Sequence, residues 1–161
     1  MNKTKTSQTI VLPDGRHLGF AEYGDPAGQP VFHFHGSAGS RLDRPAGESI
    51  LWKQGIRFIS VERPGHGLSD FQSNRRLVDW PKDVSELADQ LDLKAFYIEG
   101  WSAGGPHALA CACFLPDRVK AVALIASGAP MKRDGALSGL PFPNLVLAAS
   151  ARWFPPLTYL I

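Results

Sequence analysis

Short apolar runs alternate with helix-like segments along most of the chain, a pattern typical of a parallel sheet covered by helices. Near the N-terminus, two alternating segments flank Pro13-Asp14-Gly15, a turn sequence that predicts a β-hairpin. The pattern predicts hairpin strands at 7–12 and 16–23, later strands at 31–34, 56–61, 95–99 and 119–125, and helices at 43–54, 79–91 and 106–114. The expected fold class is therefore α/β, with a mostly parallel sheet and flanking helices.

Composition places the chain among globular proteins with a single core. It has 161 residues, of which 44% are hydrophobic and 20% are charged, and this is enough apolar surface for one domain. The 17 basic and 15 acidic residues give a formal net charge of +2 and are scattered along the sequence. Because no basic stripe of the kind that binds a phosphate backbone is present, we expect no nucleic-acid partner.

The sequence also bears on location and on cysteine chemistry. Residues 1–10 lack the apolar region of a secretory signal, and no apolar stretch reaches the roughly 18 residues of a membrane span. We therefore expect no membrane span and a cytoplasmic location. Cys111 and Cys113 lie two positions apart on an expected helix and point in different directions, so we interpret them as packing residues.

The candidate chemistry is concentrated in Gly100-Trp101-Ser102-Ala103-Gly104, a G-x-S-x-G sequence between a predicted strand and a predicted helix. A nucleophilic serine on such a sharp turn needs Gly100 and Gly104 two positions to either side, because larger side chains would collide with the strand and the helix. The turn lifts the Ser102 hydroxyl off the sheet. It also places the backbone N–H of Ala103 at a helix N-terminus, where the helix dipole favours a developing oxyanion.

A second oxyanion donor is expected from the small-residue loop that follows the strand at 31–34. This loop begins His35-Gly36 and offers the backbone N–H of Ser37, and its glycines keep the approach to that group open. The sequence contains no cluster with metal-ligand spacing and no phosphate-binding G-x-x-x-x-G-K motif. We therefore expect a serine site without a metal and without a cofactor.

Three of these segments, in this order, resemble the α/β-hydrolase superfamily in its serine-nucleophile branch. They are His35-Gly36, the segment Arg63-Pro64-Gly65-His66-Gly67-Leu68-Ser69-Asp70, and the G-x-S-x-G around Ser102. The resemblance covers about residues 8–130. It implies that Ser102 is the nucleophile, that the amides of Ser37 and Ala103 form an oxyanion hole, and that a small ester or amide is cleaved through an acyl-enzyme.

The resemblance further implies that the chain holds only the N-terminal part of the family fold, without its last strands and helices. We expect core residues at 1–134 and the start of a cap at 135–161, an apolar segment punctuated by prolines with one charge, Arg152. The strand at 119–125 would then be an open sheet edge. Because an apolar edge strand invites pairing with another chain, we expect self-association through it.

The sequence departs from the family in its histidines. The family orders its triad as serine, then Asp or Glu, then histidine, and here no histidine follows His107. We interpret His107 as a packing residue, and His35 and His66 as loop-bracing residues near the pocket mouth, with a substitute general base as the alternative for either. Asp134 is a weak candidate for the triad acid and is interpreted as a solvated loop charge.

Two functions therefore stay open. One is a serine hydrolase of the esterase or peptidase kind, of which this chain is the front portion. The other is a non-catalytic α/β-hydrolase-like fragment or binding module that keeps the elbow but lacks the base. For the remaining residues we expect Trp52 and Trp80 in the core, Trp101 lining the acyl pocket or packing beneath the elbow, and Arg63 and Asp70 supporting a rim loop.

Overall fold

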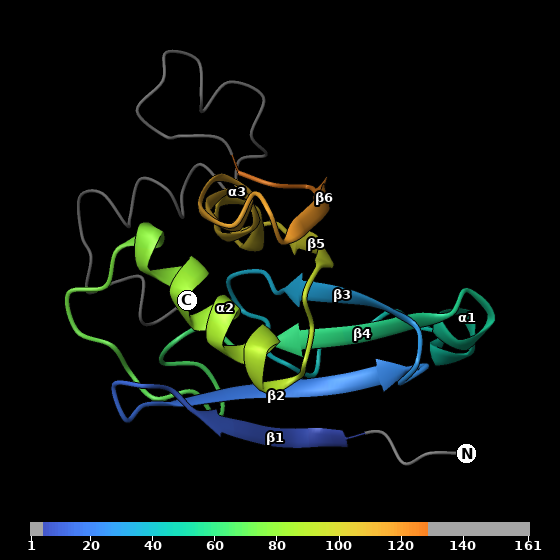
Figure 1. The fold of residues 1–161 in the computed structure, drawn as a ribbon, viewed down its shortest axis with the longest axis horizontal. Coiled ribbons are helices and arrows are strands. Elements are labelled where there is room, and N and C mark those ends of the chain that lie inside the picture. The colour runs from blue at the N-terminus through green and yellow to red at the C-terminus, as the bar shows by residue number, and fades with distance from the viewer. Residues whose placement is uncertain (1–4, 129–161) are drawn as a thin grey trace. The chain divides into compact units, whose positions relative to one another are not determined.

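The computed structural model describes residues 5–128, in which six strands form one sheet (Figure 1): β1 (Lys5–Val11), β2 (His17–Gly24), β3 (Gln29–Phe34), β4 (Ile56–Val61), β5 (Phe96–Trp101) and β6 (Val119–Ile125). The strand order is β1-β2-β4-β3-β5-β6. β2 pairs antiparallel with both β1 and β4. The pairs β4–β3, β3–β5 and β5–β6 are parallel. The predicted strands, the opening hairpin and the mostly parallel sheet are confirmed.

Within residues 5–128, three α-helices connect the strands: α1 (Glu48–Lys53), α2 (Trp80–Gln90) and α3 (Gly104–Phe114). The predicted helix at 43–54 is wrong in its first half, because α1 begins only at Glu48. Gly47 before it is extended, with φ −121° and ψ 93°, and Pro45 disfavours helical backbone at the residue that precedes it. The other two helices agree with prediction, although α3 begins two residues earlier than expected.

Asp79, the first residue of the predicted helix at 79–91, precedes α2 but does not cap it with its side chain. A short 3₁₀ helix, Leu77–Asp79, leads directly into α2, so Asp79 is itself helical, with φ −83° and ψ −21°. Its carboxylate instead accepts a hydrogen bond from the backbone N–H of Arg76 at 2.8 Å. The cap therefore serves the 3₁₀ turn rather than the α-helix.

The sheet separates two apolar clusters, one on each face. The larger cluster joins the sheet to α2 and α3 and includes the fully buried Trp80, whose ring meets Phe34 edge-on with centroids 5.2 Å apart. The smaller cluster packs the sheet against Leu51 of α1. The expected core position of Trp80 is confirmed. That of Trp52 is wrong: its side chain is 44% exposed, because Leu51 is the residue that α1 buries.

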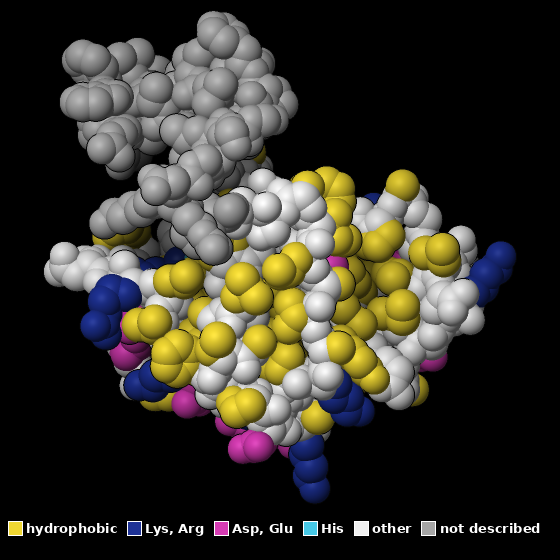
Figure 2. All heavy atoms as spheres, turned by 90° about the horizontal axis from the view of Figure 1, so that it is seen from above, with side chains coloured by type: hydrophobic (Ala, Val, Ile, Leu, Met, Phe, Trp, Pro, Cys, Tyr) yellow, Lys and Arg dark blue, Asp and Glu magenta, His cyan; other side chains and the backbone are white. Residues whose placement is uncertain are grey.

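β6 forms an edge of the described sheet, since it pairs with β5 and with no other strand in residues 5–128. Several apolar side chains near it are exposed, among them Trp101, Leu124 and Ile125. Figure 2 looks onto the side on which β6 lies, and it shows apolar side chains of the described residues gathered there. Self-association through this edge stays a prediction.

Within residues 5–128, no helix combines the length and apolar character needed to cross a membrane.

Three expectations fall on residues that the structure does not describe. The described residues all belong to one unit, Met1–Gly128. The proposed boundary between 1–134 and 135–161, the cap segment and the side chain of Asp134 lie beyond this range. They stay predictions.

Candidate active site

Ser102 lies on a sharp turn between the end of β5 and the start of α3. Its backbone φ is +48°, in the left-handed region that non-glycine residues rarely adopt. The Ser102 N–H donates to the carbonyl of Ile125 at 2.9 Å, and its carbonyl accepts from the N–H of Gly105 at 3.1 Å. The strand, tight turn and helix expected from the sequence are therefore present, and main-chain hydrogen bonds hold the strained residue in place.

Glycines surround the turn because no side chain would fit there. A Cβ at Gly100 would lie 2.8 Å from the Cα of Gly105, and a Cβ at Gly104 would overlap the carbonyl oxygen of Phe34. A Cβ at Gly105 would overlap the side chain of Ser127. The need for small residues at Gly100 and Gly104 is confirmed. The same need at Gly105 was missed, although the doubled glycine after Ala103 was a visible signal.

Ala103 occupies the N-cap position of α3, with φ −65° and ψ −11°. Its N–H therefore belongs to the first turn of a helix, where main-chain donors lack intrahelical acceptors and the dipole favours negative charge. Within the described residues this N–H donates no hydrogen bond. The group is thus free to meet an anionic oxygen beside Ser102.

The loop after β3 lies directly against this turn. A Cβ at Gly36 would lie 3.5 Å from the Cβ of Ser102 and 3.3 Å from Cδ1 of Trp101. Ser37, the next residue, is exposed, and in the described part of the chain its N–H donates no hydrogen bond. The structure therefore brings together the two segments that the sequence assigned to one site.

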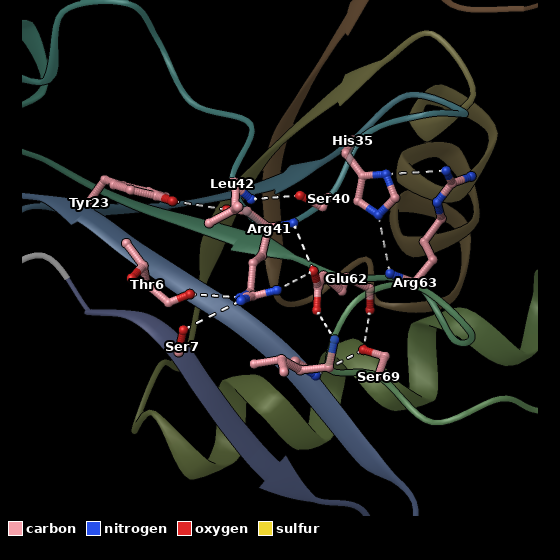
Figure 3. Close-up of polar contacts among 12 residues, drawn as sticks. Thr6, Ser7, Tyr23, His35, Ser40, Arg41, Leu42, Glu62, Arg63 and Ser69 are labelled. Carbon is pink, nitrogen blue, oxygen red and sulfur yellow. Dashed lines mark hydrogen bonds and ion pairs between the residues drawn. The ribbon is translucent and has the colours of Figure 1, made fainter.

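His35 lies in the interior rather than at the expected pocket mouth, and its ring faces Arg63 (Figure 3). Its Nε2 accepts from the backbone N–H of Arg63 at 3.4 Å, and its Nδ1 lies 2.8 Å from the carbonyl oxygen of Gly36. Because a carbonyl can only accept, the proton is on Nδ1. Burial lowers the pKa of His35 to about 3. The ring is therefore a neutral brace with both nitrogens engaged, and it is unsuited to act as a general base.

Arg63 is buried beside His35 and donates from Nη2 to the same Gly36 carbonyl at 2.7 Å. Burial lowers the pKa of its guanidinium to about 10, so the group remains a cation at neutral pH. The supporting role expected of Arg63 agrees with these contacts. Asp70 supports the same loop from its other end, since its carboxylate accepts from the backbone N–H of His17 at 2.7 Å.

A buried carboxylate that sequence reasoning missed holds the loops on either side of this brace. Glu62 is fully buried, and its side chain accepts from Nη1 of Arg41 at 2.7 Å and from the N–H of Leu68 at 2.6 Å (Figure 3). Paired in this way, the charge is compensated although it has left water. The available signal was an acidic residue at the end of an apolar strand, immediately before Arg63.

The remaining histidines are not hydrogen-bonded to Ser102 in the described part of the chain. His107 bonds through Nδ1 to the carbonyl of Ala103 at 3.0 Å and meets Trp80 edge-on, which agrees with its expected packing role. Burial lowers its pKa to about 4. His33 pairs with Glu99 across the sheet, and the ring of His66 lies 5.0 Å from that of His35.

A cavity of about 660 Å³ lies on the sheet face beneath α1. Trp101 lines it together with residues of β3, β4 and β5, including His33, Phe58 and Glu99, but Ser102 is not among the described residues that line it. The exposed Trp101 therefore does not pack beneath the elbow. Its side chain points to the opposite side of β5 from the apolar cluster under α3.

A mainly parallel α/β sheet with a strained serine between a strand and a helix defines the class of α/β-hydrolase-like proteins. Residues 29–153 match the family model of the alpha/beta hydrolase fold. The chain therefore belongs to this family, and the resemblance noted from its motifs is confirmed.

Named relatives extend this assignment. The chain is 32% identical over 137 residues to a non-heme chloroperoxidase of Streptomyces lividans, covering 83% of this chain and 50% of that protein. It is 26% identical over 136 residues to 3-oxoadipate enol-lactonase 1 of Acinetobacter baylyi, covering 80% of this chain and 51% of that protein. The solved esterase EaEST from Exiguobacterium antarcticum is 26% identical, with a TM-score of 0.71, and the match covers 94% of this chain and 58% of the esterase. The chain thus spans about half the length of the curated relatives it matches.

Proposed function

We propose that the chain carries the nucleophile of a serine hydrolase that cleaves a small ester or amide through an acyl-enzyme. The observation that carries this proposal is the left-handed backbone of Ser102, with φ +48°, at a turn cleared by glycines. Such strain persists only where the surrounding structure imposes it, and it is found preferentially at functional sites. Named relatives include an esterase and an enol-lactonase, and these names favour ester-type substrates.

In this proposal the Ser102 hydroxyl attacks the substrate carbonyl carbon while a base takes its proton. The carbonyl oxygen becomes an oxyanion, which the N–H groups of Ala103 and Ser37 stabilise. Collapse of this intermediate expels the alcohol or amine with a proton and leaves an acyl group on Ser102. Water then attacks the acyl-enzyme, releasing the acid and restoring the serine.

The base is the part of this mechanism that the described residues leave open. Of the sequence's five histidines, His35 and His107 have hydrogen bonds and lowered pKa values that favour neutral, structural rings. His33 and His17 pair with carboxylates. His66 lies beside the buried ring of His35 and stays the alternative base among the described histidines, since its Nδ1 has no partner within residues 5–128. The contacts of the other four histidines favour the second candidate function, a non-catalytic binding module that retains the elbow geometry.

The two candidates differ in the reactivity of Ser102 toward a fluorophosphonate, which modifies activated serines. The experiment incubates the purified chain with the probe and measures intact mass, with circular dichroism to verify folding and Ser102→Ala as the matched control. A single adduct on the native chain that is absent from S102A is the result expected of the hydrolase. A folded chain that acquires no adduct would exclude catalysis by this chain alone and leave the binding module.

A further inference from the structure

The carbonyl oxygen of Gly36 is an unusually well-held group in the described fold. It accepts from Nη2 of Arg63 at 2.7 Å, from Nδ1 of His35 at 2.8 Å and from the N–H of Gly39 at 3.2 Å. Arg63 is 7% exposed and His35 is fully buried. One main-chain carbonyl therefore collects three donors, of which one is a buried cation.

Burying the Arg63 guanidinium at this position is energetically unfavourable, and packing alone would not require it. Burying a guanidinium removes its hydration, and this cost is ordinarily offset by a carboxylate. Among residues 5–128, Arg63 forms no salt bridge, and its Nε has no hydrogen-bond partner. Its principal acceptor is thus the Gly36 carbonyl, which points to a function for this contact.

Holding that carbonyl also fixes the amide on the other side of the peptide bond. The peptide is planar and, like every peptide in the described chain, trans, so the N–H of Ser37 points away from the Gly36 oxygen. The oxygen faces Arg63 and His35. The N–H of Ser37 therefore points to the opposite side of the Gly36–Ser37 peptide, in a segment that lies against Ser102. Within the described residues this N–H donates to no acceptor.

We propose that Arg63 is a positioning residue for the oxyanion hole, acting through the Gly36–Ser37 peptide. The charged guanidinium holds the Gly36 carbonyl and withdraws electron density from the peptide, which makes the Ser37 N–H a stronger and better oriented donor. His35 assists as a neutral second donor to the same oxygen. This inference rests on the proposed function, in which Ser37 contributes to stabilising negative charge beside Ser102.

The test compares Arg63→Met with a matched control, Arg118→Met. Arg118 also donates from Nη2 to a main-chain carbonyl, that of Leu93 at 2.6 Å, and is only 20% exposed. Two quantities are measured for each variant in ¹⁵N-labelled protein: the N–H residual dipolar coupling of Ser37, which reports the direction of that bond, and the rate of fluorophosphonate labelling at Ser102. Thermal unfolding is recorded in parallel.

In R63M we expect an altered or averaged Ser37 coupling and labelling slowed by about tenfold or more, because a misdirected donor stabilises an oxyanion poorly. R118M is expected to lower the unfolding temperature while keeping both the Ser37 coupling and the labelling rate. A Ser37 coupling in R63M equal to that of the wild type would overturn the inference. Arg63→Lys keeps the charge but not the planar fork, and an intermediate coupling is expected. If R63M does not fold, R63K decides by the same comparison.

The residual dipolar coupling of Ser37 distinguishes a failure of this inference from a failure of the proposed function. If the wild-type chain is never labelled but its Ser37 coupling changes in R63M and not in R118M, the hydrolase proposal fails for this chain while the positioning of Ser37 by Arg63 is supported. If labelling occurs in the wild type and R63M changes neither quantity, the hydrolase proposal stands and the role of Arg63 is refuted.

Discussion

His33 and Glu99 occupy paired positions on the adjacent parallel strands β3 and β5, and their side chains are hydrogen-bonded on the sheet face that bears the cavity. His33 is 5% exposed and also stacks on Phe58, with ring centroids 5.2 Å apart. Within residues 5–128 its Nε2 has no partner. A polar pair therefore lies on a mainly apolar sheet face and depends on the hydrogen bond between its two members.

The pair predicts a strong non-additivity between two substitutions. Glu99→Leu removes the partner of a buried ring nitrogen and should lower the free energy of unfolding by about 2 kcal/mol. In the double variant H33L/E99L neither polar group remains, so most of this loss should be recovered. Urea denaturation of the two single variants and the double variant gives the coupling energy. Additive losses would show that the two side chains act independently.

The clearance at Gly104 predicts a much larger effect than an ordinary glycine substitution. A Cβ there overlaps the main-chain oxygen of Phe34, which belongs to a central strand and cannot move aside. We expect Gly104→Ala to lower the free energy of unfolding by about 3 kcal/mol or to prevent folding.

The matched control is Gly47→Ala, because a Cβ at Gly47 meets only the Ser49 hydroxyl, at 4.0 Å, and its φ is −121°. Its cost should stay within about 1 kcal/mol. Urea denaturation curves measured on G104A and G47A under the same conditions provide the comparison. Equal stability of the two variants would contradict the close contact between the elbow and Phe34.

The elbow could be predicted from the sequence because its requirements are local. A serine held at positive φ between a strand and a helix needs small neighbours within two or three residues. Gly100 and Gly104 meet this need and are visible in the sequence. The strands could be predicted for a similar reason, since their apolar runs and turns are read from neighbouring positions.

The bracing contacts could not be predicted because they join segments that are distant in sequence. Arg41 and Glu62 lie 21 positions apart, and His33 and Glu99 lie 66 apart. The position of Glu62 at the end of an apolar strand was a local signal, but it does not identify Arg41 as the partner of the carboxylate. Nothing near His35 indicates that Arg63 will cover it. The interior position of His35 likewise follows from how two loops pack, a tertiary outcome that no periodicity encodes.

The left-handed backbone of Ser102 predicts that glycine stabilises this position while removing its chemistry. A non-glycine residue in this region costs about 1 kcal/mol, so Ser102→Gly should raise the free energy of unfolding by up to about that amount, less the added entropy of the unfolded chain. Ala126 has the same φ of +48° and is exposed, which makes Ala126→Gly the matched control.

Both glycine variants should therefore gain stability in urea denaturation, whereas only S102G should lose fluorophosphonate labelling. A126G that gains stability alongside an S102G that loses it would show that the Ser102 side chain contributes contacts in the folded state that outweigh the backbone strain. Loss of labelling in A126G would mean that the adjacent end of β6 takes part in the site.

Burial of two histidines predicts a fold that weakens as the pH falls. The pKa of His107 is lowered to about 4 and that of His35 to about 3, in both cases chiefly because burial disfavours the charged ring. In the unfolded chain a histidine titrates near pH 6.5. Above that pH the rings are neutral in both states. Below it the unfolded chain binds protons that the folded chain does not, so the free energy of unfolding decreases.

For one such group the decrease is about 1.4 kcal/mol per pH unit between about pH 6.5 and the folded pKa. His107→Phe keeps the aromatic edge contact with Trp80 but cannot titrate, so its stability curve should be shallower than that of the wild type by about this slope between about pH 6 and pH 4.5. The lowered pKa values of Asp14, Asp70 and Asp79 affect stability mainly below this window, where carboxylates become protonated. Urea denaturation at half-unit pH intervals measures both slopes, and parallel curves would show that His107 is protonated as readily in the folded chain as in the unfolded one.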